Sequence, residues 1–183
     1  YSSIAHAGYM LLAMPVMSGD SIYAIMMYLV MYLFMNLGAF FVVIIVKNKT
    51  GGESFDDYKG LGWEMPFVGA AMTLFMVSLT GLPPTAGFIG KFYIFASLIK
   101  GGSTYYWLVV IGGINSVVSL YYYLKVVKVM YFEGERTDKI LFPSNVLTGT
   151  LIFTAVPSLF LGIYWNPIAS WIQNSLVFFT QNL

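Results

Sequence analysis

Long stretches without a charged residue constrain this chain more than any other feature. The stretches 21–46, 104–124 and 144–165 contain no Asp, Glu, Lys or Arg. A helix needs about 20 apolar residues to cross a bilayer core roughly 30 Å thick, and each stretch is that long. Only 9% of the residues are charged, whereas soluble domains typically have about 25%. The sequence therefore predicts an all-α fold, a polytopic bundle of transmembrane helices.

Two further apolar passages differ in length from a simple crossing. Residues 1–17 form a short one. Because the chain begins at Tyr1 in the middle of the pattern and without Met, we expect it to be part of a longer protein. Residues 65–99 form a passage that would reach roughly 52 Å as one straight helix. The sequence thus predicts about five passages in a single membrane domain, residues 1–183, with one passage interrupted.

The interruption is expected within "SLTGLPPTAGFIGKFYIF", residues 78–95. Five of its residues are predicted to form a broken-helix hinge: Gly81, Pro83, Pro84, Gly87 and Gly90. Proline removes a backbone donor and clashes with the preceding turn, and glycine lowers the cost of non-helical backbone. We predict half-helices at 65–80 and about 89–99, joined by an irregular link. Discontinuous helices of this kind mark ion sites in membrane transporters.

Lys91 is the only charged residue between Glu64 and Lys100. A lysine at the centre of a bilayer costs about 2.5–3.5 kcal/mol on insertion scales, and such residues commonly serve function. Lys91 is therefore a candidate for proton transfer. The alternative is that its ammonium group extends to the membrane surface along its own aliphatic stem.

His6, in "YSSIAHAGYM", is the single histidine. Imidazole titrates near neutral pH, so His6 is a second candidate for proton transfer, with hydrogen-bonded packing as the alternative. Tyrosines at 121–123 and Lys125 are predicted to close the crossing 104–124. Such residues usually form a belt at the membrane surface, and a transfer role for Lys125 is the other possibility.

Basic residues predict the orientation of the chain. The two longest connectors, 47–64 and 128–143, are expected on one side of the membrane. They hold Lys47, Lys49, Lys59, Lys128, Arg136 and Lys139, whereas the other side has Lys100. The positive-inside rule then places the long connectors in the cytoplasm. We expect a bacterial inner membrane, with an organellar or thylakoid membrane as the alternative.

The end of the chain, residues 167–183, follows Pro167 and is apolar on one side. An amphipathic helix in the membrane surface is one prediction, with Trp171, Leu176 and Phe179 in the lipid. An extension of the last crossing is the other.

Several kinds of chemistry are excluded for this chain. It has no cysteine, so it forms no disulfide and holds no Cys-ligated zinc or iron–sulfur cluster. One histidine also excludes most His-based metal sites. The net charge of +1 gives no electrostatic basis for binding nucleic acid. We therefore expect no redox cofactor in the chain itself.

Several motifs resemble a known family. "YSSIAHAGYM" resembles the "AYSSISHxGY" element of the antiporter-like subunits of proton-pumping NADH:quinone oxidoreductase, respiratory complex I. "SLTGLPPTAGFIGKFYIF" and "SVVSLYYYLKVVKVMY" are similar to the broken helix and the next helix of the subunit N type, called subunit 2 in mitochondria. "YLFMNLGAF" and "DYKGLGW" fit the segments between them. The order is the family's order over nearly the whole chain.

The resemblance implies the C-terminal part of a 14-helix subunit built from two inverted five-helix repeats. Lys91 matches the family's lysine on the second broken helix, and His6 matches a histidine in the preceding element; both would transfer protons. FMN, iron–sulfur clusters and quinone would lie in other subunits. The implied partners are neighbouring antiporter-like subunits, small membrane subunits and the lipid bilayer.

Four other functions stay open. The chain also suits the photosynthetic ferredoxin:plastoquinone version of the complex. A cation/proton antiporter or membrane-bound hydrogenase shares the ancestry of these subunits. A structural membrane subunit would have Lys91 at the membrane surface. An accessory assembly protein is the last alternative.

Overall fold

The structure, a computed structural model, describes residues 2–134, 140–141 and 143–181. These residues form helices and connecting segments without a β-strand, which confirms the predicted all-α fold. The α-helices are α1 (Ser2–Ala13), α2 (Gly19–Thr50), α3 (Leu61–Glu64), α4 (Pro66–Thr80), α5 (Ala86–Lys100), α6 (Tyr106–Phe132), α7 (Asn145–Ile163) and α8 (Asn166–Gln181). Three short 3-10 helices are Met14–Val16, Phe55–Tyr58 and Ser103–Tyr105.

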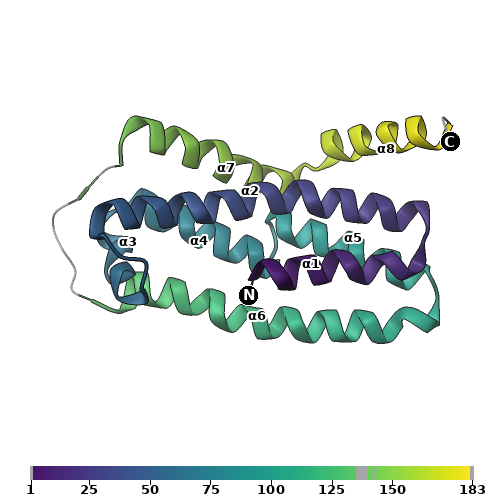
Figure 1. Cartoon of the computed structure of the whole chain (residues 1–183), viewed down its shortest axis with the longest axis horizontal. Coiled ribbons are helices and arrows are strands. Elements are labelled where there is room, and N and C mark those ends of the chain that lie inside the picture. The colour runs from purple at the N-terminus through teal and green to yellow at the C-terminus, as the bar shows by residue number, and fades with distance from the viewer. Residues whose placement is uncertain (1, 135–139, 142, 182–183) are drawn as a thin grey trace.

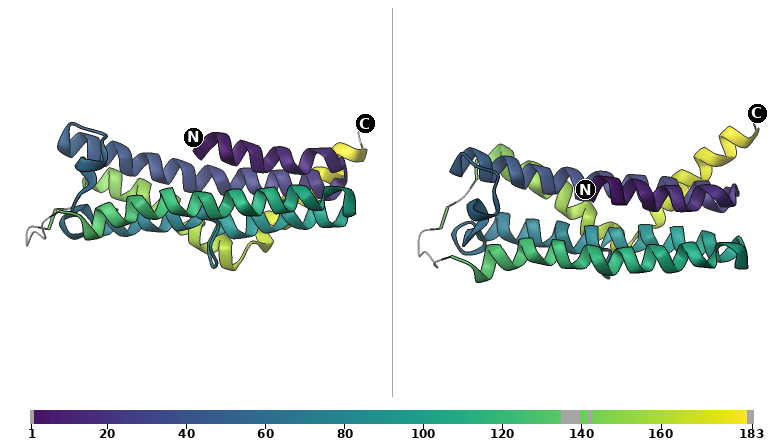
Figure 2. Two further views of the ribbon diagram at one scale, coloured as in Figure 1. Left: turned by 90° about the horizontal axis from the view of Figure 1, so that it is seen from below. Right: turned by 60° about the horizontal axis from the view of Figure 1, so that its bottom comes forward.

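The helices form an elongated bundle around α2 (Figures 1 and 2). α2 packs against α1, α4, α5, α7 and α8, while α6 packs against α1, α3, α4 and α5. α4 and α5 lie end to end between α2 and α6, so together they follow the length of the bundle (Figure 1). α1 begins about halfway along and covers only the half that holds α5.

Local signals set the limits of α2. The Ser18 hydroxyl accepts the N–H of Ser21 at 3.1 Å, and the Ser18 N–H donates to the Ser21 hydroxyl at 3.0 Å. This reciprocal pair satisfies N–H groups that the first helical turn leaves without partners. At the other end, Gly51 takes a left-handed conformation with φ of +79°. Such a glycine ends many helices.

The predicted interruption lies between α4 and α5. α4 ends at Thr80, and Gly81 follows with φ of +86°, donating its N–H to the carbonyls of Val77 and Ser78. α5 begins at Ala86, after an irregular link at 81–85. The hinge residues Gly81, Pro83 and Pro84 therefore lie in the link, as expected.

Gly87 and Gly90 lie within α5, because the second half-helix begins three residues before the predicted position 89. Their role is close packing rather than irregular backbone. A Cβ atom at Gly87 would overlap the Ser78 carbonyl oxygen, and one at Gly90 would lie 2.8 Å from Cδ2 of Tyr28. The Gly87 N–H also donates to the Ser78 hydroxyl at 3.2 Å. Glycine at position 87 thus lets the start of α5 approach the end of α4.

Within the described residues, three segments are long and apolar enough to cross a membrane alone: Gly19–Thr50, Ser103–Phe132 and Asn145–Ile163. A bent pair, Phe55–Glu64 with Pro66–Thr80, makes a fourth if it counts as one span. The predicted number was about five. The difference arises because α1 has 12 residues and α4 and α5 have 15 each, fewer than the roughly 20 that a crossing needs.

α7 and α8 follow the opposite side of α2. α7 ends beside the α4–α5 link, and a Cβ atom at Gly162 would overlap the Pro84 carbonyl oxygen. α8 then continues toward the other end of the bundle (Figure 1). Ile172 of α8 is buried among α2 residues that include Met27 and Met31. Residues 166–181 thus form a separate helix on α2, and the Phe179 side chain lies outside the described part.

The described parts of the two long connectors lie at one end of the bundle, as the orientation prediction requires (Figure 1). Here Leu141 donates its N–H to the Glu64 carbonyl at 2.8 Å, and Lys49 forms an ion pair with Glu64. Arg136 and Lys139 lie outside the described residues. At the opposite end, Lys100 forms an ion pair with Asp20 at 2.8 Å.

Candidate functional site

Lys91 lies on α5, one and a half turns after the link, and its side chain is 5% exposed. Its Nζ donates to the Thr80 carbonyl oxygen at 2.6 Å and to the Ser116 hydroxyl at 2.7 Å. It also lies 4.5 Å from the centre of the Tyr9 ring. These partners are neutral groups from α4, α6 and α1.

The helix break creates this setting. The last carbonyl groups of an α-helix have no intrahelical donor and carry a partial negative charge. Because α4 ends at Thr80, its carbonyl is free to accept the Lys91 ammonium. The left-handed Gly81 also leaves space for the lysine stem, since a Cβ there would lie 2.7 Å from Cδ of Lys91. An unbroken helix would provide neither the carbonyl nor the space.

A cavity of about 490 Å³ adjoins Lys91. Residues from α5 and α6 line it, including Phe92, Phe95, Ile99, Lys100 and Ser116. The cavity therefore extends along α5 from the buried Lys91 to Lys100 in the last turn. Its walls are largely apolar, and its polar groups are the two lysines and the serine.

His6 is 1% exposed and is held through both ring nitrogens. Nδ1 lies 2.6 Å from the Tyr28 hydroxyl, and Nε2 lies 3.0 Å from the Tyr123 hydroxyl. Tyr32 stacks on the ring with 4.9 Å between the centroids. The predicted alternatives for His6, hydrogen-bonded packing and proton transfer, are both compatible with this geometry.

Tyr9 lies between the two candidates. Its ring lies under the Lys91 ammonium, and its centroid is 6.1 Å from that of His6. The Tyr9 hydroxyl donates to the Gly112 carbonyl at 3.3 Å, which fixes the ring. The structure thus places Lys91 and His6 in one buried cluster, although they belong to helices far apart in the sequence.

Lys125 lies elsewhere. It is exposed on α6, and its Nζ lies 4.9 Å above the Phe55 ring, near the long connectors. Next to Phe55, Ser54 donates to Asp57 through its hydroxyl and its N–H at 2.7 and 2.8 Å, and these bonds lower the pKa of Asp57. The structure does not bring Lys125 to Lys91 or His6.

The belt predicted at residues 121–123 is wrong for Tyr123. α6 continues to Phe132, so these tyrosines lie inside the helix and not at its end. Tyr121 is 76% exposed, whereas Tyr123 is 4% exposed and faces His6. Residue type alone does not distinguish a tyrosine at a helix end from a tyrosine buried between helices, and this is why the prediction fails for Tyr123.

The sequence prediction also missed several partners: Thr80, Ser116, Tyr28 and Tyr123. For the partners on α6, the spacing of polar residues in the sequence could have indicated that they share a buried face. Ser116, Ser119 and Tyr123 recur at intervals of three and four residues, which places them on one helix face. Ser119 is also buried, and its hydroxyl donates to the Ser116 carbonyl at 2.7 Å. A polar stripe on an apolar helix predicts a face toward protein.

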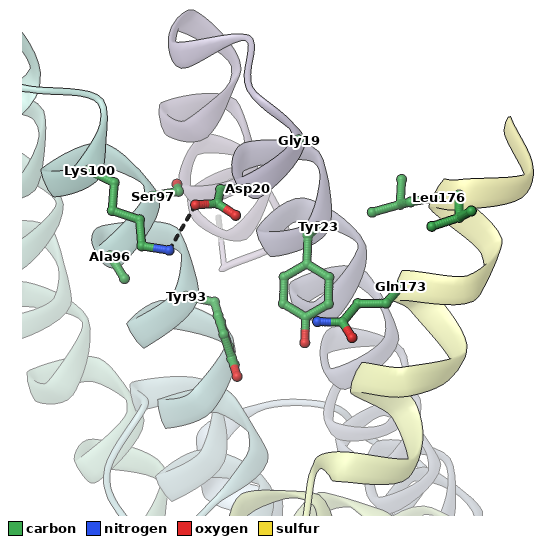
Figure 3. A pocket seen from close by; sticks show the side chains of 10 residues that line it. Gly19, Asp20, Tyr23, Tyr93, Ala96, Ser97, Lys100, Gln173 and Leu176 are labelled. Carbon is green, nitrogen blue, oxygen red and sulfur yellow. Dashed lines mark hydrogen bonds and ion pairs between the residues drawn. The ribbon is translucent and has the colours of Figure 1, made fainter. Parts of the chain in front are cut away.

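A polar pocket lies between α2, α5 and α8, at the end of the bundle opposite the long connectors (Figure 3). Its volume is about 520 Å³, and the Asp20–Lys100 ion pair lines it. Tyr23, Tyr93 and Gln173 add polar atoms. Both charges are well exposed and paired with each other. Ala96 and Lys100 line both this pocket and the cavity beside Lys91.

In the described part of the chain, no group of three or more His, Asp or Glu side chains is placed to hold a metal ion. The candidate site therefore consists of a lysine, a histidine, tyrosines and hydroxyl groups. Such groups bind, orient and pass protons.

Known proteins resemble this chain over nearly its whole length. The chain is 50% identical over 182 residues to a protein of Sorangium cellulosum named NADH-quinone oxidoreductase subunit N 2, matching 96% of this chain and 35% of that protein. The chain thus spans about a third of the length of the curated relatives it matches.

Solved structures show the same fold. Respiratory complex I from Thermus thermophilus contains a chain with a TM-score of 0.71 and 29% identity, covering 93% of this chain and 38% of that one. An archaeal membrane-bound sulfane sulfur reductase contains one with a TM-score of 0.84 and 23% identity, covering 97% and 36%. The second likeness concerns the fold alone.

A family model assigns the chain directly. The model described as NADH:quinone oxidoreductase/Mrp antiporter, transmembrane, matches residues 1–119. The match includes α1, α2, the broken passage α4–α5 and the part of α6 that holds Ser116. The chain belongs to the NADH:quinone oxidoreductase/Mrp antiporter transmembrane family.

Proposed function

We propose that this chain is part of a subunit N-type protein that transfers protons across the membrane within NADH:quinone oxidoreductase. Lys91 is the proposed transfer group, and His6 is the second. FMN, the iron–sulfur clusters and quinone belong to other subunits of such a complex. Those subunits and the bilayer are its partners, and a bacterial inner membrane is its location.

One observation carries the proposal: the Lys91 ammonium lies buried at a helix break with neutral partners. A lysine that only anchors a helix at the membrane surface needs no such environment. Its partners are a carbonyl, a hydroxyl and an aromatic ring. Since no carboxylate forms an ion pair with Lys91 among the described residues, its charge is stabilised without a fixed counter-ion. Such a group can lose and regain a proton when a neighbouring charge changes.

The cavity beside Lys91 supports the same role. It gives the ammonium a way toward Lys100 at the end of the bundle that lies opposite the long connectors. Movement of a proton through this subunit would then depend on conformation and electrostatics, because redox chemistry occurs elsewhere in the complex.

The test uses the complete complex carrying Lys91→Met, reconstituted in vesicles. Proton uptake and NADH oxidation are measured together, and assembly is checked by subunit content. We expect a lower ratio of protons moved to NADH oxidised. Lys128→Met is the matched control, because Lys128 is exposed and paired with Glu133 at 3.1 Å. An unchanged ratio in an assembled Lys91→Met complex would overturn the proposal.

A further inference from the structure

Two tyrosines and a serine extend the contacts of His6 into a continuous row of hydrogen bonds. The row runs from the Ser2 hydroxyl to the Tyr123 hydroxyl, then through the His6 ring to the Tyr28 hydroxyl. It joins three helices, because Ser2 and His6 belong to α1, Tyr123 to α6 and Tyr28 to α2. Every member can both donate and accept a hydrogen bond.

The chemistry of imidazole gives this row two possible directions. Neutral imidazole has one N–H donor and one acceptor nitrogen, and the two can exchange roles. In one direction Tyr123 donates to Nε2 and Nδ1 donates to Tyr28. In the other, Tyr28 donates to Nδ1 and Nε2 donates to Tyr123. The same heavy-atom geometry satisfies both states, so neither needs a side chain to leave its place.

We propose that Tyr123, His6 and Tyr28 form a proton-conducting row, with the two tyrosines as relay residues for the transfer proposed above. A proton arriving at the Ser2 oxygen displaces the Ser2 proton onto Tyr123. The Tyr123 proton moves to Nε2, the Nδ1 proton moves to Tyr28, and the Tyr28 proton passes to a water molecule, which the proposal requires as the acceptor beside the Tyr28 hydroxyl. One proton enters and one leaves, and only O–H and N–H bonds form or break. Rotation of the hydroxyls and the reverse tautomer change restore the row.

The two ends of the row differ in their surroundings. Ser2 lines a cavity of about 590 Å³ whose walls are mostly apolar. At the other end, the side of the Tyr28 ring packs against Gly90, the residue before Lys91. Tyr9, which lies under the Lys91 ammonium, is 6.2 Å from Tyr28 between ring centroids. The row therefore runs from this cavity to a tyrosine that packs beside the Lys91 cluster.

Burial isolates the middle of the row. Tyr28, His6 and Tyr123 are 0%, 1% and 4% exposed. Bulk solvent therefore does not compete for their hydrogen bonds. Whether each group donates or accepts depends on its neighbours in the row. A low-dielectric setting also strengthens each bond and couples it to its neighbours.

A packing role makes a different prediction from a conducting role. If the hydroxyls only satisfy the ring nitrogens, then any side chain with one donor and one acceptor can replace His6. Glutamine provides both but cannot exchange them through the side chain. Tyr32 supplies the matched control for the tyrosines, because it stacks on His6 through its ring.

The experiment compares variants of the complete complex with Lys91→Met as the reference. Tyr28→Phe, Tyr123→Phe and His6→Gln are expected to lower the ratio of protons moved to NADH oxidised as far as Lys91→Met does. Tyr32→Phe is expected to retain the wild-type ratio. Each phenylalanine removes one hydroxyl and keeps the ring, and subunit content reports assembly. The three variants alter three different helices, so any one that assembles gives a result.

The outcomes separate the two proposals. A wild-type ratio in an assembled Tyr28→Phe or Tyr123→Phe complex, with a low ratio in Lys91→Met, overturns the row alone. A wild-type ratio in an assembled His6→Gln complex overturns the row and also the transfer role proposed for His6. An equal loss in Tyr32→Phe would also overturn it, because packing would then explain the effect. A wild-type ratio in Lys91→Met would instead overturn the proposed function.

Discussion

Among the described residues, the Lys91 ammonium bonds to the end of a helix and to a hydroxyl, and no acidic side chain pairs with it. The carbonyl oxygen of Thr80 accepts a hydrogen bond from the ammonium at 2.6 Å, and a carbonyl has no proton of its own to pass on. The Ser116 hydroxyl, in contrast, can both accept a hydrogen bond and pass a proton on. We propose that the two partners differ in role: Thr80 stabilises the charge, and Ser116 is the partner through which a proton can be relayed.

Ser116→Ala tests this division at the level of one hydroxyl. We expect a lower ratio of protons moved to NADH oxidised, and a loss of folded-state stability of about 1.5–3 kcal/mol, typical of a hydrogen bond to a charged group. Ser119→Ala is the matched control, because its hydroxyl bonds within α6 to the Ser116 carbonyl. Vesicle pumping and thermal unfolding of the complex are the measurements. Equal pumping by the two variants would contradict the assigned role of Ser116.

Close contact between α4 and α5 holds the broken passage together. Gly87 occupies a position where a side chain would overlap the Ser78 carbonyl, and its N–H bonds to the Ser78 hydroxyl. The break is therefore a packed junction in which the end of α4 and the start of α5 share contacts. This junction keeps Thr80 and Lys91 at a fixed distance.

Gly87→Ala should separate the two half-helices. Overpacking in a well-packed core costs about 1–3 kcal/mol and sometimes more, so we expect a lower thermal midpoint and less assembled complex. Gly113→Ala is the control, since a Cβ atom at Gly113 meets open space. Alanine there should be neutral or stabilising by up to about 1 kcal/mol, as is usual inside a helix. A Gly87→Ala complex as stable as the control would show that the junction is looser than described.

The positions of several elements can be predicted from the sequence because they depend on local pattern. Apolar runs predict α2, α6 and α7, although α6 continues to Phe132. Pro83 and Pro84 predict the break between α4 and α5. The predicted start of α5 is too late, because Gly87 serves close packing and not irregular backbone. α1, α4 and α5 are each shorter than a full crossing, so fewer helices than predicted passages can cross a membrane alone.

The candidate site was only partly predictable. Lys91 and His6 stand out because a titratable residue is rare in an apolar run. Tyr28 and Tyr123 do not, since the chain has 14 tyrosines and most suit a membrane surface equally well. Which of them turns inward depends on how α2 and α6 rotate against α1. That rotation follows from tertiary packing, which residue type does not encode.

Across the whole molecule, the helices are interrupted twice at the same level of the bundle: between α4 and α5, and between α7 and α8. Gly162, near the end of α7, packs on the α4–α5 link at Pro84. The polar contacts of Lys91 also lie at this level. The bundle thus has apolar helices toward both ends and a central zone where backbone ends, hydroxyls and a lysine meet. Irregular backbone at membrane depth is tolerated where protein buries it.

The orientation of the bundle gives a labelling prediction. Asp56, near the long connectors, and Thr104, at the opposite end, are both exposed. Asp56→Cys and Thr104→Cys in the full-length subunit should react with a membrane-impermeant thiol reagent from opposite sides. The positive-inside rule assigns Asp56→Cys to the cytoplasmic side. Labelling of both from one side would contradict the arrangement.

Lys91→Arg in the complete complex tests whether Lys91 transfers protons, because it separates the positive charge from the ability to lose a proton. Arginine keeps a positive charge near the α4 carbonyls, but it does not deprotonate in proteins. The measurement is the ratio of protons moved to NADH oxidised in vesicles, with subunit content as the check on assembly. We predict an assembled complex that moves fewer protons than wild type. A wild-type ratio would mean that Lys91 serves through its charge alone and does not transfer protons.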